Sequence, residues 1–417
     1  MKIIDYFYTL KNRINQPFIP FMKQIVISNK INYLGTNDRK KELFENNWPL
    51  PNGVAYNSYL INDDKTALVD TLEFGSKDDY LDVIASQLGG KPLDYIIVNH
   101  MEPDHSSMIG VLLKFYPEVK VVSNIKAFKM LEAYFKISPD NFLEVKEGEV
   151  LDLGYHKLTF YITPWVHWPE TMMTYDKTDK VLFSCDAFGS FGTLDGGIFD
   201  DEINFAFYED EMRRYYSNIV GKYSNMVQKA FAKLAGIDVK VIAPTHGPVW
   251  RTNPAKVLGL YDKWSKYEAE EGVVIVFASM YGNTEQMADY IARKLSENGV
   301  KNIIIHDVSR THISYLINDV WKYKGLIVGS CAYTSRAFPL MEQFARELVH
   351  IKLKKRFVGI FGSYSWNGGG VKSLKEFIDE TDLELVSEPV DIYGKPNLEK
   401  LAKCDELAKN MALKLKG

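Results

Sequence analysis

Four side chains that could bind a metal occur within six residues of one another. The segment reads Asn99-His100-Met101-Glu102-Pro103-Asp104-His105 and follows an apolar run at 95–98. Imidazole and carboxylate groups are common ligands of transition metals, and burying them beside an apolar strand is costly without a partner. Pro103 keeps Glu102 out of helical geometry, so we expect a loop whose alternate side chains point to one centre. The segment therefore predicts a metal site.

Three further candidate ligands lie later in the chain. His167 stands between two tryptophans, and Asp186 and His246 each follow an apolar run. Polar residues at the carboxyl ends of strands in α/β sheets usually face one crevice, so these side chains could converge with the first segment. Taken singly, a histidine is more often a core or surface residue, and an aspartate after a strand is more often a turn former. We therefore predict these three residues as ligands only in combination with the segment 100–105.

The second half of the chain offers a different chemistry. An apolar run at 273–278 leads into Ser279-Met280-Tyr281-Gly282-Asn283-Thr284, which precedes an expected helix. Hydroxyls, an amide and a glycine at a helix N-terminus favour a phosphate group. The segment matches neither GxxxxGK[ST] nor GxGxxG, which makes a P-loop or a classical dinucleotide site a weak interpretation. Such a turn, taken alone, is usually only a helix cap.

Two later loops combine aromatic residues with glycine at the ends of expected strands. They are Cys331-Ala332-Tyr333-Thr334-Ser335 and Ser363-Tyr364-Ser365-Trp366-Asn367-Gly368. A planar ring could stack on tyrosine or tryptophan while backbone amides meet its polar edge. Trp366 alone could be an ordinary exposed aromatic beside a glycine-rich turn. Three loops at the same end of one sheet, however, predict a flavin site.

The elements that must position these residues change character near residues 252–272. Up to about residue 250, short β-rich runs mixed with helical patterns predict a layered α/β domain, with expected strands that include 24–33 and 54–61 and an expected helix over 209–234. Pro254 opens a polar helix that we interpret as a connector. Five strands then alternate with helices, which predicts a doubly wound parallel sheet. These strands are expected at 273–278, 302–307, 325–329, 357–361 and 383–386, and we place the domains at 1–255 and 271–417.

The composition excludes several classes of protein. The 417 residues carry a net charge of −4, so the basic surplus of a nucleic-acid binder is missing. No run approaches about 18 apolar residues, so we expect no membrane-spanning helix, and the first residues do not resemble a signal peptide. The three cysteines are scattered and form no CxxC pair, which argues against a disulfide framework, a cysteine zinc site or a rubredoxin-type iron site. A cytoplasmic location is expected.

The order of candidate ligands resembles that of the metallo-β-lactamase superfamily. Zinc hydrolases of that superfamily carry histidine where this chain has Glu102, and the glutamate form resembles the flavodiiron proteins, or A-type flavoproteins. Oxygen donors beside imidazoles suit iron better than zinc, which favours nitrogen and sulfur. The resemblance covers roughly residues 25–415. It implies an N-terminal metallo-β-lactamase-like αββα sandwich followed by a flavodoxin-like doubly wound parallel sheet.

The resemblance also implies two cofactors and a set of ligands. One iron would take His100, Glu102 and His167, the other would take Asp104, His105 and His246, and Asp186 would bridge them. The residue at the position of His105 does not bind iron directly in every member of that family. The flavodoxin-like domain would bind FMN. Family members often have Pro-Thr where this chain has Cys331-Ala332, which affects the expected contacts with the flavin ring.

Iron and flavin in one chain argue for electron transfer. By resemblance, we expect reduction of O2 to water with electrons relayed through FMN, and reduction of NO to N2O is the alternative within the family. The resemblance further implies a head-to-tail homodimer or a dimer of dimers. An external donor such as rubredoxin or a flavoprotein reductase is expected, because we find no third redox module in the sequence.

Two interpretations from other classes remain open at this point. One is a zinc-dependent hydrolase fused to a flavodoxin-like domain, and the other is an electron carrier with a non-functional metal site. Glu102 argues against the first, and the complete set of seven candidate ligands argues against the second. The sequence does not specify the preferred gas, the donor, the flavin potential or the role of residues 1–25.

Overall fold

The computed structural model describes residues 25–416, and these divide into two compact units. Of residues 1–25, whose role the sequence does not specify, residues 1–24 lie outside the described part of the chain. The domain limits 1–255 and 271–417 remain a prediction. The first unit contains the described residues up to Asn46, Leu50–Met212 and Asn225–Gly259, and the second contains Asn47–Pro49, Arg213–Ser224 and the chain from Leu260 onward.

Within the described residues, the first unit contains a seven-stranded and a five-stranded sheet. The seven-stranded sheet has the order β1-β2-β7-β8-β9-β10-β11, and the five-stranded sheet runs from β12 to β16 in sequence order. The strands of the larger sheet are β1 (Ile25–Ser28), β2 (Ile31–Tyr33), β7 (Tyr59–Asn62), β8 (Thr66–Val69), β9 (Tyr95–Ile97), β10 (Lys120–Ser123) and β11 (Phe142–Glu144). Those of the smaller sheet are β12 (Val150–Asp152), β13 (Lys157–Ile162), β14 (Met172–Asp176), β15 (Val181–Cys185) and β16 (Val241–Pro244).

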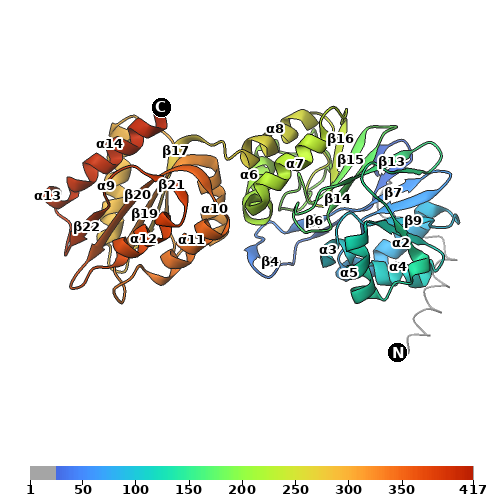
Figure 1. The fold of residues 1–417 in the computed structure, drawn as a ribbon, viewed down its shortest axis with the longest axis horizontal. Helices are drawn as coiled ribbons and strands as arrows, with labels where there is room; N and C mark the ends of the chain where they lie inside the picture. Colours follow the sequence, from blue (N-terminus) through green and yellow to red (C-terminus); the bar gives the residue numbers. More distant parts are fainter. Residues whose placement is uncertain (1–24, 417) are drawn as a thin grey trace. The chain divides into compact units, whose positions relative to one another are not determined.

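Helices accompany both sheets of the first unit, as the sandwich architecture requires (Figure 1). They include α2 (Lys77–Leu88), α3 (Pro103–Ser106), α4 (Ile109–Phe115), α5 (Ile125–Phe135), α6 (Phe205–Tyr215), α7 (Ser224–Leu234) and the start of α8 (Pro254–Ser265). The single helix expected over 209–234 is wrong, because a π-type turn at Tyr216–Val220 and a 3-10 turn at Gly221–Tyr223 separate α6 from α7. The predicted αββα class is confirmed.

Two expected strands are each split in the structure. Within the expected strand 24–33, residues 25–33 form a hairpin of β1 and β2, with Lys30 in the left-handed region at φ 58°. The run 54–61 forms β6 (Val54–Tyr56) and β7, which belong to different sheets. Asn57 stands between β6 and β7, and its backbone N–H and side-chain amide donate to carbonyls of Pro244, Thr245 and Gly247. A residue bonded to a distant loop cannot continue a ladder, so the strand breaks there.

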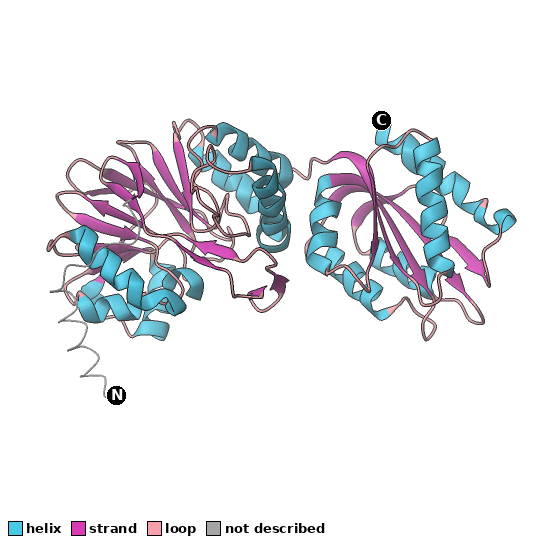
Figure 2. Cartoon of the chain, turned by 180° about the vertical axis from the view of Figure 1, so that it is seen from behind, coloured by secondary structure: helices cyan, strands magenta, loops and turns pink. Residues whose placement is uncertain are grey.

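The second unit is a parallel sheet with helices on both faces (Figure 2). The order β18-β17-β19-β20-β21 confirms the predicted flavodoxin-like doubly wound sheet. Its strands are β17 (Glu270–Ala278), β18 (Ile303–Asp307), β19 (Tyr323–Cys331), β20 (Lys354–Tyr364) and β21 (Asp382–Leu385). Its helices include α9 (Asn283–Glu297), α10 (Ile313–Lys322), α11 (Pro339–His350), α12 (Gly370–Asp379), α13 (Leu398–Leu401) and α14 (Lys403–Lys416).

The prediction of five strands in this sheet is wrong by one strand. β21 pairs with the first half of β20, and a further strand, β22 (Val390–Tyr393), pairs with its second half. The sheet order also places β18 and β20 on opposite sides of the central pair β17 and β19. The connections from β17 and β19 therefore run in opposite directions, and sheets of this kind bind ligands at the carboxyl ends of such strands.

Candidate metal centre and cofactor loops

The segment with the four candidate ligands is held by hydrogen bonds to the loop after β8. Asn99 donates its backbone N–H and its side-chain amide to the two oxygens of Asp70, each at 2.8 Å. Thr71 donates both its N–H and its hydroxyl to the carbonyl of His105. Both ends of the segment are thus fixed from a neighbouring parallel strand. Only part of it is a loop, because Pro103–Ser106 form the short helix α3, while Glu102 stays extended at ψ 138°.

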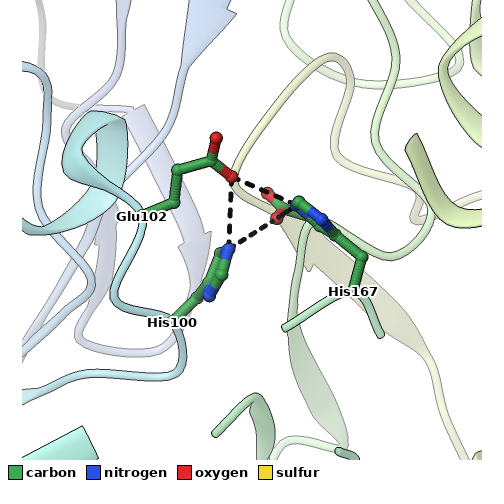
Figure 3. A group of neighbouring side chains, drawn as sticks. His100, Glu102 and His167 are labelled. Carbon is green, nitrogen blue, oxygen red and sulfur yellow. Dashed lines mark hydrogen bonds and ion pairs between the residues drawn. The ribbon is translucent and has the colours of Figure 1, made fainter. Parts of the chain in front are cut away.

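The first donor cluster contains His100, Glu102 and His167 (Figure 3). One oxygen of Asp186 completes it. Oε2 of Glu102 lies 3.3 Å from Nε2 of His100 and 3.1 Å from Nε2 of His167. Oδ2 of Asp186 lies 3.4 and 3.2 Å from the same two nitrogens. Ligand atoms about 2.1 Å from one ion at roughly right angles are about 3 Å apart, so these four atoms could surround a single metal.

The second donor cluster consists of Asp104, His105, His246 and the other oxygen of Asp186. Nε2 of His105 lies 2.9 Å from Oδ1 of Asp186 and 3.4 Å from Oδ1 of Asp104. Nε2 of His246 lies 3.3 Å from Oδ2 of Asp104 and 3.6 Å from Oδ1 of Asp186. All seven predicted ligand residues therefore come together, and Asp186 presents one oxygen to each donor cluster. The role of these seven residues as metal ligands remains a proposal.

The side chains of both clusters are buried, and three of them are carboxylates. None of the seven residues is more than 8% exposed. Burial alone would lower the pKa of His105, but the charges of Asp104 and Asp186 raise that pKa to about 9. The pKa of His167 is raised to about 9 for a similar reason, through Asp186 and Glu102. Burial would raise the pKa of Asp186, but the charge of His105 and its hydrogen bond hold it well below its usual range.

These observations fit a pair of cations. Both side-chain oxygens of Asp104 are buried, and neither accepts a hydrogen bond from any residue that the structure describes. Buried carboxylate oxygens are normally hydrogen-bonded or bound to a metal. Three carboxylates and four imidazoles in two adjoining sets supply the mixed oxygen and nitrogen donors that suit iron. The residues present therefore fit a dinuclear iron site.

Sequence reasoning missed the residues that support the ligands. Asp70 and Thr71 follow β8 directly and could have been noticed as polar residues after an apolar strand. Glu170, whose carboxylate lies 2.8 Å from Nδ1 of His100, offered no such signal, because it stands three residues beyond His167 in an irregular loop. These contacts depend on tertiary folding.

A third group of potential ligands has a structural explanation. His156 and Asp176 form a buried pair with Nδ1 and Oδ2 2.9 Å apart, and Asp179 lies nearby. The other ring nitrogen of His156 lies 2.7 Å from the carbonyl of Asn29, and Asp176 also accepts backbone N–H groups of Lys157 and Asp179. Because these atoms are already hydrogen-bonded, we assign no metal to them.

The three predicted flavin loops all leave the carboxyl ends of β17, β19 and β20. Hydrogen bonds connect them: the hydroxyls of Thr284 and Ser363 are 2.9 Å apart, and the amide of Asn367 donates to the hydroxyl of Ser335 at 2.7 Å. Ala332 donates its N–H to the carbonyl of Ser363 at 2.8 Å. The three segments thus form one connected surface.

This surface has the features that a flavin nucleotide requires. Gly282 adopts φ 86° directly before α9, a conformation that favours glycine and leaves the helix N-terminus open to an anion. The side chains of Tyr281 and Trp366 are 90% and 78% exposed, so their ring faces are free for stacking. Met280 and Tyr333 are also exposed, while Cys331 is buried. The residues fit FMN, and their individual contacts remain a proposal.

Comparisons with known proteins identify the families of both domains. The model of the ODP family beta lactamase matches residues 54–247, and that of flavodoxin matches residues 275–414. The chain therefore joins a lactamase-type domain to a flavodoxin domain. It is 30% identical to the anaerobic nitric oxide reductase flavorubredoxin of Escherichia coli over 393 residues, which cover 93% of this chain and 82% of that protein.

Solved structures resemble the chain over nearly its whole length. The rubredoxin oxygen:oxidoreductase of Desulfovibrio gigas matches with a TM-score of 0.90 and 28% identity, covering 94% of this chain and 99% of that one. A flavo di-iron protein variant from Thermotoga maritima matches with a TM-score of 0.86 and 27% identity, covering 94% and 98%. The chain belongs to the flavodiiron protein family. It is an oxidoreductase whose cofactors are FMN and a non-haem diiron centre.

In residues 25–416, no helix has both the length and the apolar character needed to cross a bilayer.

Proposed function

We propose that this protein reduces O2 to water at a diiron site, with electrons that reach the irons through FMN. The observation that carries the proposal is the position of Asp186, whose two oxygens face two complete donor clusters. A hydrolytic zinc centre does not need this glutamate- and aspartate-rich set, and the relatives named above are oxidoreductases. The hydrolase and electron-carrier alternatives are therefore not retained.

In this proposal, the residues of each cluster have defined tasks. His100, Glu102 and His167 would hold one iron, and Asp104, His105 and His246 would hold the other. Asp186 would contribute one oxygen to each position. When bound, the two irons and FMN supply the electrons for reduction of the gas. The three carboxylates offset the charge of the metal ions, and burial of all seven side chains limits the access of bulk water.

Reduction of NO to N2O is the second candidate activity. It is favoured by the likeness to the flavorubredoxin of Escherichia coli, which is named an anaerobic nitric oxide reductase. The Desulfovibrio gigas structure, named an oxygen oxidoreductase, favours O2. Two electrons suffice to couple two NO molecules, whereas four are needed to convert O2 to two waters, so the stored electrons of the reduced chain could serve either reaction.

Partners and location complete the proposal. An external donor such as rubredoxin or a flavoprotein reductase would reduce the FMN. A head-to-tail homodimer, alone or as a dimer of dimers, would place the FMN of one chain beside the irons of its partner. We propose a cytoplasmic location, because all three cysteines are buried and none forms a disulfide.

The test is anaerobic stopped-flow spectroscopy of reduced protein with a known iron and FMN content. Mixing with O2 and with NO in separate experiments measures the rate at which FMN is reoxidised by each gas. Faster reoxidation by O2, with no accumulation of peroxide, is the expected result. Reoxidation by NO alone would favour the second candidate, and reoxidation by neither gas would contradict both.

A further inference from the structure

The carboxylate of Glu170 is buried against the first donor cluster although Glu170 is not one of the seven candidate ligands. The residue is 1% exposed, and its Oε1 lies 2.8 Å from Nδ1 of His100. The same oxygen accepts the backbone N–H of Met101 at 3.0 Å. Glu170 is therefore bound to two successive residues of the segment that carries His100 and Glu102.

This contact determines which nitrogen of His100 can bind a metal. Because Oε1 of Glu170 accepts a hydrogen bond, Nδ1 of His100 carries the proton and Nε2 presents its lone pair. Nε2 is the nitrogen that faces the cluster, 3.3 Å from Oε2 of Glu102. A carboxylate behind a ligand histidine fixes its tautomer and ring orientation and makes it a stronger base toward the metal.

The second donor cluster has no equivalent carboxylate among the contacts seen in residues 25–416. Nδ1 of His246 lies 2.9 Å from the carbonyl of Ala55, which is a neutral acceptor. Nδ1 of His105 is buried and has no hydrogen-bond partner there. The buried carboxylate of Asp70 interacts with both His105 and His100, so it acts on both clusters, whereas Glu170 is hydrogen-bonded to a ligand of the first cluster. In a buried site, such a charge favours the more highly charged state of a nearby metal ion.

The loop that carries Glu170 also carries His167. Its ends are fastened by the hydroxyl of Thr171, which donates to the carbonyl of Thr163 at 2.5 Å. The amide of Asn124, on a separate element, donates to the carbonyl of Glu170 at 2.6 Å. One loop therefore reaches the first cluster twice, directly through His167 and indirectly through Glu170 and His100.

We propose that Glu170 is a positioning residue that makes the two metal positions unequal. By orienting His100 and adding negative charge, it strengthens iron binding at the first position and lowers the reduction potential of the iron there relative to the second. This inference rests on the proposed diiron site and does not depend on which gas is reduced.

The test uses metal-free protein titrated anaerobically with Fe(II). In Glu170→Ala, the affinity for one of the two ions is expected to fall by about 10- to 100-fold, and the other ion binds as in the wild type. Glu170→Gln keeps an oxygen that can accept from His100, so most of the affinity should return. Because this variant lacks the charge, the potential of one iron should rise in a redox titration followed by EPR.

Asp176→Asn is the matched control. Asp176 is also buried in the first unit and lies 2.9 Å from Nδ1 of a histidine, His156, that is not a candidate ligand. This variant should change stability while both iron affinities and potentials remain as in the wild type. Equal loss of both irons in Glu170→Ala, or unchanged affinity and potential in both Glu170 variants, would overturn the inference. Wild-type protein that binds two irons but reduces neither gas would instead contradict only the proposed function.

Discussion

At the scale of single residues, Asp186 connects the two donor clusters. Its Oδ1 lies 2.9 Å from His105, and its Oδ2 lies 3.2 Å from His167. The carboxylate is fully buried directly after β15, where it cannot turn toward water. Removing it would leave imidazoles from both clusters without their shared acceptor, so its loss should affect both metal positions together.

Replacing Asp186 with alanine is expected to abolish the activity. We predict that Asp186→Ala lowers gas consumption by at least about 100-fold, because a bridging ligand contributes more than the outer partners whose loss costs about 10- to 100-fold. Iron analysis and gas electrodes would measure the effect. Asp195→Ala is the control, since Asp195 is exposed and pairs with Arg39. Normal activity in iron-loaded Asp186→Ala protein would refute the bridging role.

The pair of His156 and Asp176 predicts a pH-dependent contribution to stability. Burial alone would lower the pKa of His156, but its hydrogen bond with Asp176 raises the pKa above 6.5. Protonated His156 therefore stabilises the folded state fully below about pH 6.5. This contribution is lost as the pH rises through the folded-state pKa.

Urea unfolding of the wild type and of His156→Gln would check this linkage. The difference in the free energy of unfolding between the two proteins should be larger at about pH 6 than at about pH 9. A difference that grows toward high pH would mean that His156 is neutral in the folded protein.

At the scale of elements, the flavin surface depends on contacts between loops from different strands. Thr284 lies in the first turn of α9, and its hydroxyl lies 2.9 Å from that of Ser363 near the end of β20. Thr284 is fully buried, so its hydroxyl has no water to replace a lost partner. The position of one loop is thus coupled to that of another.

Thr284→Val is expected to weaken FMN retention. The substitution preserves the shape of the side chain and removes its hydroxyl, leaving Ser363 without this partner and the phosphate-binding turn less well fixed. A loss of about 1–1.5 kcal/mol in binding free energy corresponds to roughly tenfold weaker FMN binding. Fluorescence titration of flavin-free protein would measure it, and Thr284→Ser should bind nearly as the wild type does. Unchanged FMN affinity in Thr284→Val would contradict the assignment.

The elements also show what sequence reasoning could reach. Alternating apolar strands and amphipathic helices after residue 272 predicted the parallel sheet, and local spacing identified the segment 100–105. β22 was missed because Val390–Tyr393 is a short strand that forms only by pairing with the end of β20. The break at Asn57 and the contact of Glu170 with His100 depend on residues distant in sequence, which no local pattern encodes.

At the scale of the whole molecule, the two cofactor sites belong to different compact units. The donor clusters lie in the first unit and the flavin loops in the second. Electron tunnelling weakens steeply with distance, so the proposed head-to-tail dimer would bring together the FMN and the irons of different chains. Electron transfer between two chains predicts an outcome for mixed dimers that electron transfer within one chain does not predict.

Mixed dimers should recover activity from two inactive chains. Thr284→Val protein freed of FMN keeps its iron ligands, and Asp186→Ala protein keeps its flavin loops. When the two are dissociated and reassociated together, the mixed dimer should regain a fraction of wild-type gas reduction, measured with a gas electrode and no added FMN. If electrons pass only within one chain, the mixture will stay as inactive as each variant alone.

The central claim is that seven buried side chains hold two irons in a chain that also binds one FMN. Metal and flavin analysis of protein purified without oxygen tests it most directly. We predict two irons and one FMN per chain, with zinc absent from protein produced in iron-replete medium. A single metal ion per chain, or zinc in place of iron under those conditions, would contradict the account.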